Sequence, residues 1–287
     1  MNSKPEWLKM KAPDEVVLDK MENMLKKLSL HTVCESANCP NIGKCFKHKT
    51  ATFMVMGDTC TRNCRFCAVN KGMPQELDPK EPENVAIASK KLGLKHTVVT
   101  SVTRDDLEDG GAEHFVKIIK AMRRENPHST VELLIPDLNG NWNALKDIID
   151  ARPDILNHNI ETVESLYKKV RPLAIYDRSI ELLRQVKIFN SSVYTKCGIM
   201  LGLGETKQQV LKVMDDLLKV GCDILTIGQY LRPSKKHLPV FEYVTPEKFA
   251  EYKKMALDKG FKVVFSGPYV RSSYKAFESI KILENLK

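Results

Sequence analysis

The 287-residue sequence has no run of 18 apolar residues, so hydropathy predicts no membrane span and no membrane partner. Its start, MNSKPEWLKMKAPDE, has neither the apolar core of a signal peptide nor the Arg- and Ser-rich, acid-poor composition of a transit peptide, which predicts a cytoplasmic protein. Aromatic residues make up only 7% of the chain. Their scarcity disfavours a nucleic-acid-binding module, since such modules stack bases on aromatic rings.

Acidic residues are outnumbered, with 36 Asp and Glu against 45 Lys and Arg, a net charge of +9. This excess allows an anionic cofactor or an acidic protein as partner. The lysines are spread along the whole length, so a merely soluble basic surface is the simpler interpretation. Hydrophobic residues make up 43% of the chain, enough to bury one large α/β domain or two small ones.

Six of the eight cysteines lie between positions 34 and 67, and in a chain without an export signal this clustering indicates metal rather than disulfides. CTRNCRFC places three thiols at C-x3-C-x2-C, namely Cys60, Cys64 and Cys67. CESANCPNIGKC places three more at C-x4-C-x5-C, namely Cys34, Cys39 and Cys45. Neither triplet has an obvious fourth thiol nearby.

Structural zinc normally takes four protein ligands, so a zinc site at the second triplet would need His31 or His48 in addition. Thiolates also bind iron–sulfur clusters. Three thiolates on a four-iron cube leave one iron free to hold a small molecule, which is the arrangement of a catalytic cluster. Both metal interpretations are consistent with the spacing alone.

After residue 50, apolar strand-like runs alternate with amphipathic helical ones. Strands are predicted at 51–57, 96–102, 130–136, 155–161, 194–203, 224–230 and 262–268, and helices at 83–93, 112–126, 143–152, 178–189, 207–221 and 246–260. Thr206 with Gln209 forms a capping box, Thr245 precedes Pro246 as an N-cap, and Gly221 and Gly260 stand where C-caps belong.

This alternation predicts a parallel sheet covered by its crossover helices. Six βα units and a final strand are two short of a closed eightfold barrel, so an open or partial (β/α)6 TIM-type barrel is expected first and a doubly wound sheet second. Both folds bind ligands at the carboxyl ends of the strands. The expected division is an N-terminal extension at 1–50, a barrel at 51–270 and a C-terminal segment at 271–287.

A C-x3-C-x2-C motif just after the first strand of a βα barrel, with Phe66 between its last two cysteines, resembles the radical S-adenosylmethionine (SAM) superfamily. The resemblance implies that Cys60, Cys64 and Cys67 hold a catalytic [4Fe–4S] cluster whose open iron binds the amino and carboxylate groups of SAM. It also implies SAM contacts at strand ends, with candidates Thr100, Ser101, Asn157, Asn159, Glu161, Lys196 and Gln229.

GIMLGLGE at 198–205 resembles the fifth-strand SAM motif of this superfamily, G-x-I-x-G-x-x-E, with Met200 in place of isoleucine. A buried strand that ends in a turn explains the same residues. Arg104, Asp105 and Asp106 follow the second strand, where they could contribute to the site or simply cap a helix.

The two triplets together with RSSY near the C-terminus resemble the lipoyl synthases, and KPEWL, SVTRDDLEDGGA, NHNIETV, LTIGQYLRPS and GPYVRSSY are also of their kind. The resemblance implies that Cys34, Cys39 and Cys45 bind an auxiliary [4Fe–4S] cluster with Ser273 as an unusual fourth ligand. Ser272 is the neighbouring alternative, and a helix cap is the common role of such a serine.

The activity implied is that of a sulfurtransferase. A 5′-deoxyadenosyl radical from SAM removes hydrogen from C6 and then C8 of an octanoyl chain, and the auxiliary cluster is consumed as sulfur donor, with Ser273 as a ligand that leaves. The implied partners are octanoylated lipoyl carrier domains (E2 subunits of 2-oxoacid dehydrogenases and the glycine cleavage H protein) and an electron donor such as flavodoxin or ferredoxin. Such carrier domains are commonly acidic, so the basic surface could steer their docking.

Two positions depart from the lipoyl synthase pattern: Cys197 stands where serine is common, and Lys275 follows RSSY where histidine is common. Cys197 and Cys222 are expected to be buried small hydrophobic residues. The competing interpretations are another sulfur-inserting or methylthiolating radical SAM enzyme, and a zinc module that binds nucleic acid.

Overall fold

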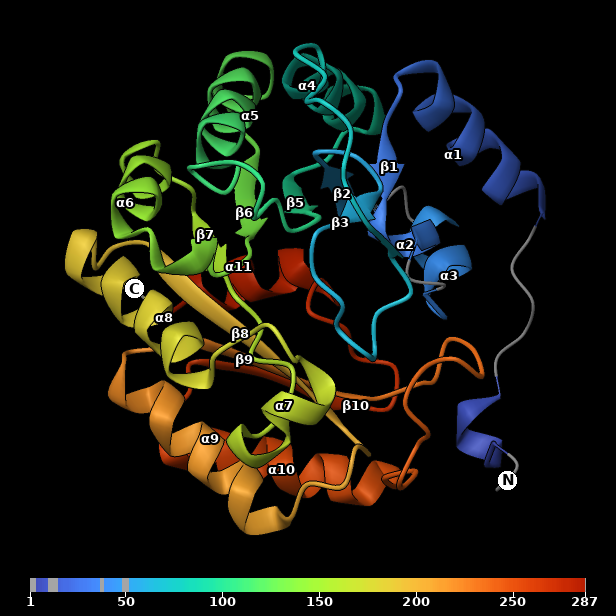
Figure 1. Cartoon of the computed structure of the whole chain (residues 1–287), viewed down its shortest axis with the longest axis vertical. Coiled ribbons are helices and arrows are strands. Elements are labelled where there is room, and N and C mark those ends of the chain that lie inside the picture. Colours follow the sequence, from blue (N-terminus) through green and yellow to red (C-terminus); the bar gives the residue numbers. More distant parts are fainter. Residues whose placement is uncertain (1–3, 10–14, 37–38, 48–51, 287) are drawn as a thin grey trace. The chain divides into compact units, whose positions relative to one another are not determined.

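The computed structural model describes residues 4–9, 15–36, 39–47 and 52–286 (Figure 1). The chain divides into two compact units. The amino-terminal unit comprises 11–63 and 68–156, and the carboxyl-terminal unit comprises 1–10, 64–67 and 157–287. The border falls inside CTRNCRFC, so Cys60 belongs to the amino-terminal unit, whereas Cys64 and Cys67 belong to the carboxyl-terminal unit. Within the expected extension at 1–50, residues 1–3, 10–14, 37–38 and 48–50 lie outside the described residues, and His48 is among them.

A parallel sheet forms the centre of the amino-terminal unit. β2 (Thr52–Val55), β5 (His96–Ser101) and β6 (Thr130–Leu134) are adjacent in chain order, with Met54 opposite Thr100 and Thr100 opposite Leu134. β1 (His31–Thr32) runs antiparallel along β2, and β7 (Ile155–Asn157) lies at the border of the unit. β3 (Thr59–Cys60) and β4 (Asn70–Lys71) form a separate parallel ladder.

Helices α4 (Glu81–Leu92), α5 (Ala112–Glu125) and α6 (Trp142–Asp150) stand side by side outside β5 and β6 (Figure 1). Each turns one apolar stripe inward, and Val85, Phe115 and Ile148 on these stripes are completely buried. The unit also contains α1 (Glu15–Lys27), α2 (Val33–Ser36), α3 (Ile42–Lys47) and the short 3-10 helix η2 (Leu138–Gly140).

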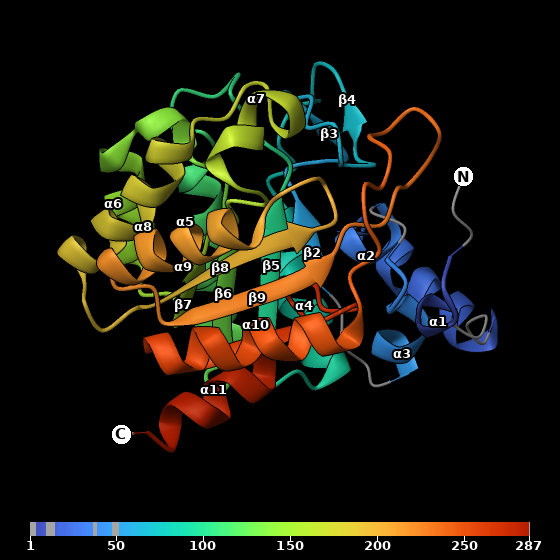
Figure 2. The ribbon, with the colours of Figure 1, turned by 90° about the horizontal axis from the view of Figure 1, so that it is seen from below.

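The carboxyl-terminal unit repeats the pattern with β8 (Tyr194–Leu201), β9 (Ile224–Gln229) and β10 (Val263–Gly267), parallel and again adjacent in chain order. Figure 2 shows β8 and β9 side by side, with α10 (Pro246–Lys259) running along the sheet. The remaining helical elements are η1 (Glu6–Leu8), η3 (Glu164–Leu166), α7 (Tyr167–Val170), α8 (Tyr176–Phe189), α9 (Lys207–Lys219) and α11 (Ala276–Glu284).

All seven predicted strands and all six predicted helices are confirmed, each within a few residues at its ends. The capping box of Thr206 and Gln209 is present, and Thr245 caps α10 with Pro246 at its first position. Within each unit the strand order follows the chain, as in a barrel, whereas a doubly wound sheet reverses its order part way. The fold is therefore the expected α/β arrangement of a partial TIM-type barrel.

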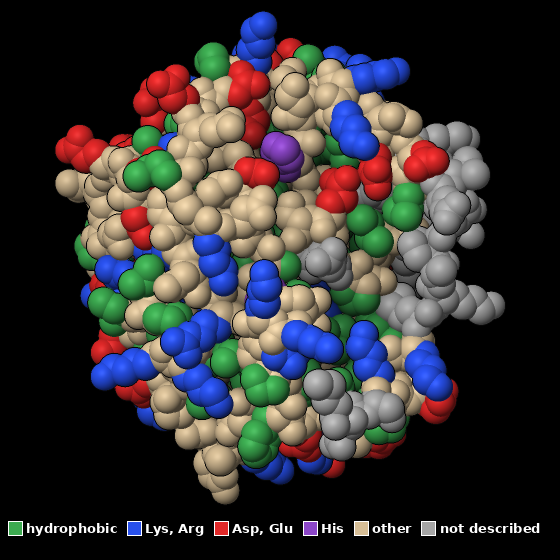
Figure 3. All heavy atoms as spheres, turned by 45° about the vertical axis from the view of Figure 1, so that its right-hand side comes forward, with side chains coloured by type: hydrophobic (Ala, Val, Ile, Leu, Met, Phe, Trp, Pro, Cys, Tyr) green, Lys and Arg blue, Asp and Glu red, His purple; other side chains and the backbone are tan. Residues whose placement is uncertain are grey.

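Neither β1 nor the helices α1, α3 and α11 were predicted as elements, because they are short or lie where no strand pattern frames them. No helix within the described residues combines the length and the apolar character needed to cross a membrane. On the face seen in Figure 3, Lys and Arg side chains occur in several places with acidic side chains among them. This agrees with the spread of lysines along the sequence.

Candidate cluster and cofactor site

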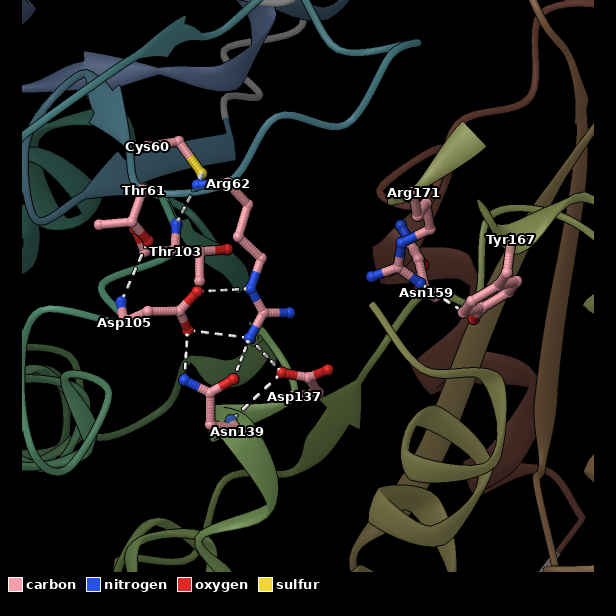
Figure 4. Close-up of polar contacts among 10 residues, drawn as sticks. All are labelled: Cys60, Thr61, Arg62, Thr103, Asp105, Asp137, Asn139, Asn159, Tyr167 and Arg171. Carbon is pink, nitrogen blue, oxygen red and sulfur yellow. Dashed lines mark hydrogen bonds and ion pairs between the residues drawn. The ribbon is translucent and has the colours of Figure 1, made fainter. Parts of the chain in front are cut away.

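The Cys60 thiol lies in the loop after β2, at the end of β3. Its sulfur accepts hydrogen bonds from two backbone N–H groups, that of Arg62 at 3.4 Å and that of Thr103 at 3.3 Å (Figure 4). The N–H of Thr61 donates to the carbonyl of Thr103 at 3.1 Å, so the two segments run together. Hydrogen bonds from amide groups to a cysteine sulfur tune the reduction potential of a cluster that the cysteine binds.

The Arg62 side chain joins three loops of the amino-terminal unit. Its guanidinium donates to both carboxylate oxygens of Asp105, at 2.7 and 2.8 Å, and to Asp137 at 2.6 Å and Asn139 at 2.9 Å (Figure 4). The Arg62 side chain is 3% exposed and that of Asp137 is completely buried. Burial opposes the positive charge, but the hydrogen bonds and charges of Asp105 and Asp137 outweigh it and raise the pKa of Arg62.

The segment after β5 has a structural role that the sequence left open. The N–H of Asp105 donates to the Thr61 hydroxyl at 3.1 Å, while its carboxylate holds Arg62. Arg104 instead pairs with Asp106 at 2.7 Å. The N-cap of α5 is Gly111, and the carboxylate of Asp109 accepts from the N–H groups of Gly111 at 2.8 Å and Glu113 at 2.7 Å. Asp105 therefore fastens the loop that carries Cys60 rather than capping a helix.

The buried pair of Glu81 and His114 holds the chain at Met56, where it leaves β2 for the loop that carries Cys60. Met56 has a left-handed backbone with φ 67°, which a methionine adopts only when its surroundings impose it. Its N–H donates to the Glu81 carboxylate at 2.8 Å, and His114 bonds the same oxygen at 2.7 Å. Gly111, which packs against Met56, has a left-handed backbone with φ 91°, a conformation that favours glycine.

Residues 64–67 are anchored within the carboxyl-terminal unit. The N–H of Arg65 donates to Val170 at 2.9 Å, its carbonyl accepts from Leu238 at 3.3 Å, and His237 donates to the carbonyl of Cys67 at 3.0 Å. The Phe66 ring packs against a cluster of buried side chains, namely Val170, Leu203 and Tyr230. The aromatic residue of the motif thus serves as a hydrophobic anchor.

The second triplet is brought together by local turns. The N–H of Cys39 donates to the carbonyl of Cys34 at 2.9 Å, and that of Cys45 donates to Asn41 at 2.9 Å. Burial, together with the neighbouring Cys39 and Cys45, raises the pKa of the Cys34 thiol to about 12, although a backbone hydrogen bond from Thr52 opposes the rise. Such a thiol ionises readily only with a cation beside it, which an iron–sulfur cluster supplies.

None of the eight cysteines forms a disulfide. In the described part of the chain, no three His, Cys, Asp or Glu side chains are close enough together to hold one metal ion, and His31 is exposed. Cysteine thiolates are the ligands that hold a [4Fe–4S] cube, so the chemistry of each triplet fits a cluster.

Thr100 and Ser101, two of the candidates for SAM contacts, lie at the end of β5, which confirms their predicted place at a strand end. The Thr100 hydroxyl donates to the carbonyl of Leu134 at 2.9 Å. The Ser101 hydroxyl is buried and has no hydrogen-bond partner among the described residues. A buried hydroxyl without a partner is costly, and a bound ligand would satisfy it.

Asn157 is buried at the end of β7, while Asn159 and Glu161 follow it. Asn159 donates to the Glu161 carboxylate at 3.1 Å, and its own side-chain oxygen is buried without a partner in the described structure. Burial raises the pKa of Glu161, and Arg171 offsets this only in part. Arg171 donates to the carbonyl of Asn159 at 2.9 Å and to the Tyr167 hydroxyl at 3.1 Å (Figure 4).

Lys196 is completely buried on β8. Gln229 ends β9, and its side-chain amide donates to carbonyls of Leu201, Tyr230 and Glu242 while its oxygen accepts from Val244 at 2.8 Å. A contact from this side chain to SAM would require one of these bonds to be given up.

GIMLGLGE forms the end of β8 and a turn that its last residue closes. The Glu205 carboxylate accepts from the N–H groups of Gly202 at 2.5 Å and Leu203 at 3.0 Å. Burial raises the pKa of Glu205 and these bonds partly offset the rise. The structure of this segment is therefore explained by a buried strand that ends in a turn, without a bound ligand.

Ser273 lies half-buried in the turn between β10 and α11. The N-cap of α11 is Lys275, with φ 53°, so Ser273 is not the cap of this helix. Lys275 pairs with Glu278 at 2.9 Å. The role of Ser273 as a cluster ligand stays a prediction.

Cys197 and Cys222 are buried, as expected, at 0% and 3% exposure. We expect Cys197→Ser to keep its iron content and activity, because the Cys197 thiol lies in the core and contributes nothing to either triplet. Iron analysis and a turnover assay of the reconstituted variant test this. Loss of iron from the variant would contradict it.

Sequence reasoning missed the Arg62 network. The signal was present in part, since SVTRDDLEDGG and IPDLNGN both place acidic and amide side chains just after predicted strands. Side chains at the carboxyl ends of adjacent parallel strands meet at one edge of the sheet. What the sequence did not reveal is which arginine they surround.

Comparison with known proteins gives the same assignment at two levels. The radical SAM superfamily profile matches residues 54–217. Lipoyl synthase of Caldanaerobacter subterraneus is 58% identical over 95% of this chain and 95% of its own length, and that of Caldicellulosiruptor saccharolyticus is 54% identical over 98% of both. Lipoyl synthase of Rubrobacter xylanophilus is 55% identical over 96% of this chain and 86% of its own.

Solved structures agree in fold alone. HydG, a maturase of the [FeFe]-hydrogenase, is 16% identical with a TM-score of 0.60 over 89% of this chain and 67% of its own. Streptococcus suis SuiB bound to S-adenosylmethionine is 11% identical with a TM-score of 0.59 over 88% of this chain and 60% of its own. With a profile over more than half of its length and curated relatives over nearly all of it, the chain belongs to the radical SAM superfamily and, within it, to the lipoyl synthases.

Proposed function

We propose that Cys60, Cys64 and Cys67 hold the [4Fe–4S] cluster that binds SAM in this sulfurtransferase. The observation that carries the assignment is the Cys60 sulfur, which accepts two backbone N–H groups from segments that Arg62 and Asp105 fasten together. Thr100, Ser101, Asn157, Asn159, Glu161, Lys196 and Gln229 remain the candidates for SAM contacts. Among them Ser101 and Asn159 are best supported, because each has a buried oxygen without a partner in the described structure.

We propose that Cys34, Cys39 and Cys45 hold the auxiliary [4Fe–4S] cluster, with Ser273 as its fourth ligand. A serine oxygen binds this iron more weakly than a thiolate would, which suits a ligand that must be released. Residues 1–50 would then act as an extension that carries the auxiliary cysteines, 51–270 as the barrel and 271–287 as the segment that supplies the serine.

When bound, the two clusters and SAM supply the radical chemistry and the sulfur that convert C6 and C8 of an octanoyl chain into a dithiolane. The chain contributes positioning. Arg62 and Asp105 fix the Cys60 segment, His237 and Phe66 fix residues 64–67, and the short turns of α2 and α3 hold the second triplet. Fixed ligands keep the reacting groups in one geometry, which is a large part of catalysis.

As a lipoyl synthase the chain acts on a lipoyl carrier protein. We propose the E2 subunits of 2-oxoacid dehydrogenases and the glycine cleavage H protein as carriers, flavodoxin or ferredoxin as electron donor, and the cytoplasm as location. The net charge of +9 supports an acidic partner.

The test is an anaerobic assay with an octanoyl-lysine peptide, a reductant and SAM. The reconstituted chain should bind about eight iron atoms, as two four-iron cubes require, and yield a dithiolane product. Cys39→Ala should bind about four, still cleave SAM and form no dithiolane, whereas Cys222→Ala serves as the matched cysteine control and should behave like the parent chain. Absence of dithiolane with both clusters bound, or bound zinc, would overturn the proposal.

A further inference from the structure

A basic loop at residues 231–241 follows β9 in the carboxyl-terminal unit. Its inner side is apolar, since Leu238 and Val240 pack against the buried Leu203 and Tyr230. Its backbone is also fixed, because the Tyr230 hydroxyl donates to the carbonyl of Leu238 at 2.7 Å. The loop is therefore held against the sheet by contacts on one side and leaves its other side to solvent.

Phe241, at the end of the basic loop, is 74% exposed. Its exposure does not come from a loose backbone, because its N–H donates to the carbonyl of Gly202 at 2.9 Å and the next carbonyl, of Glu242, accepts from Gln229 at 3.0 Å. An aromatic ring that stays exposed to water on a fixed backbone does not stabilise the free protein. Rigid exposed aromatic side chains are typical of binding hot spots.

Two uncompensated charges stand at the tip of the basic loop. Lys235 and Lys236 are exposed and form no ion pair within the described residues. Arg232 is used inside the loop, where it donates to the carbonyl of His237 at 2.8 Å, and Ser234 bonds the His237 ring at 2.9 Å. The tip is thus braced, and only its two lysine ammonium groups are available to a partner.

The same loop holds part of the proposed SAM-cluster segment. Leu238 donates to the carbonyl of Arg65 at 3.3 Å, and His237 donates to that of Cys67 at 3.0 Å. In a barrel the loop after a strand borders the ligand site. A partner seated on the basic loop would therefore sit beside the segment that the reaction uses.

We infer that the basic loop is the docking surface for an acidic face of the carrier domain, with Phe241 as apolar anchor and Lys235 and Lys236 facing carboxylates. This inference rests on the proposed function, because the carrier is its substrate. Charge complementarity selects the occupant: two lysines without ion pairs and one aromatic ring match a small acidic protein that also presents an apolar spot.

The experiment compares a whole octanoylated carrier domain with a short octanoyl-lysine peptide that is too small to reach the loop. The variants are Lys235→Glu with Lys236→Glu, and Phe241→Ala. Matched controls are Lys253→Glu with Lys254→Glu on α10, and Ile188→Ala, an apolar side chain of α8 that is 58% exposed. Iron content and kcat/KM with both substrates are measured at low and high ionic strength.

We expect each loop variant to lose about tenfold or more in kcat/KM for the carrier, mostly through KM, and to turn over the peptide like the parent chain. The lysine variant should also lose the salt dependence of carrier turnover. The control variants should leave kcat/KM unchanged for both substrates. Changing acidic residues of the carrier to lysine should restore turnover by the Lys235→Glu, Lys236→Glu variant.

Equal losses with carrier and peptide would place the loop in the catalytic site and overturn the docking role. Unchanged carrier turnover, or a dimer of the parent chain that Phe241→Ala converts to a monomer, would overturn it as well. Failure of the parent chain on the peptide would instead refute the proposed function, so the two failures are distinguishable.

Discussion

Arg62→Met should destabilise the amino-terminal unit by about 3–5 kcal/mol, the usual cost of removing one partner of a buried ion pair. Methionine has similar length but no charge, so the buried Asp137 carboxylate would lose its cation, and Asp105 would lose two hydrogen bonds. That cost is a large part of the stability of a typical domain. Denaturant unfolding of the metal-free chain measures it.

The same variant should also lose iron from the proposed SAM cluster and at least tenfold in activity, since residues that orient metal ligands typically contribute 10- to 100-fold. The physical reason is that the backbone N–H groups of Arg62 and Thr103 both donate to the Cys60 sulfur, and the Arg62 side chain holds these segments in place. Iron per chain, the reduced-cluster signal in electron paramagnetic resonance and the reduction potential of the cluster report this independently of turnover.

Arg184→Met is the matched control. Arg184 pairs with Glu181 through two parallel hydrogen bonds, at 2.7 and 2.6 Å. The Arg62–Asp105 pair has the same geometry, but the Arg184 pair is exposed on a helix. Exposed pairs contribute little, so no measurable change is expected. Equal effects of the two substitutions would contradict the role given to burial and to the Cys60 segment.

Gly228→Ala is the second substitution with a large expected effect. A Cβ at this position of β9 would lie 2.1 Å from the carbonyl oxygen of Val270, far inside contact distance. Either β9 or the segment after β10 must move, and we expect a loss of about 3 kcal/mol in the free energy of unfolding. The displaced segment leads to Ser273, so the auxiliary cluster should also lose iron.

Gly267→Ala provides the control for this prediction. Gly267 lies directly opposite Gly228 in the ladder between β9 and β10, but its Cβ would meet only a Val270 methyl at 3.5 Å, an ordinary contact. Denaturant unfolding and iron content of the two variants should differ clearly. Similar stability of both would show that backbone crowding at Gly228 is not what makes glycine necessary there.

Much of the fold was predictable because the signals are local. The period of apolar residues identified β5 and α5 from neighbours a few positions apart, and the capping box of Thr206 with Gln209 spans one helical turn. α11 was missed because no following strand frames it and its N-cap, Lys275, is not a residue typical of caps.

In the candidate site, too, the features with local sequence signals were predicted and those that depend on distant contacts were not. The cysteines of each triplet are close in sequence, so their spacing identified them directly. Arg62 acts on residues 43, 75 and 77 positions further along the chain, and nothing near it in the sequence indicates them. The exposure of Phe241 could not be predicted from the sequence either, because VFEYV resembles an ordinary, largely apolar segment.

The sequence by itself determined the alternation of strands and helices, the two cysteine triplets and the family, since each depends on residue type and short spacing. Only the tertiary structure decided that Arg62 joins three strand-end loops, that Gly228 must admit the Val270 carbonyl and that the basic loop turns Phe241 outward. The physical reason is that such contacts arise when packing brings distant segments together, and their energies depend on burial, which no single stretch of sequence fixes.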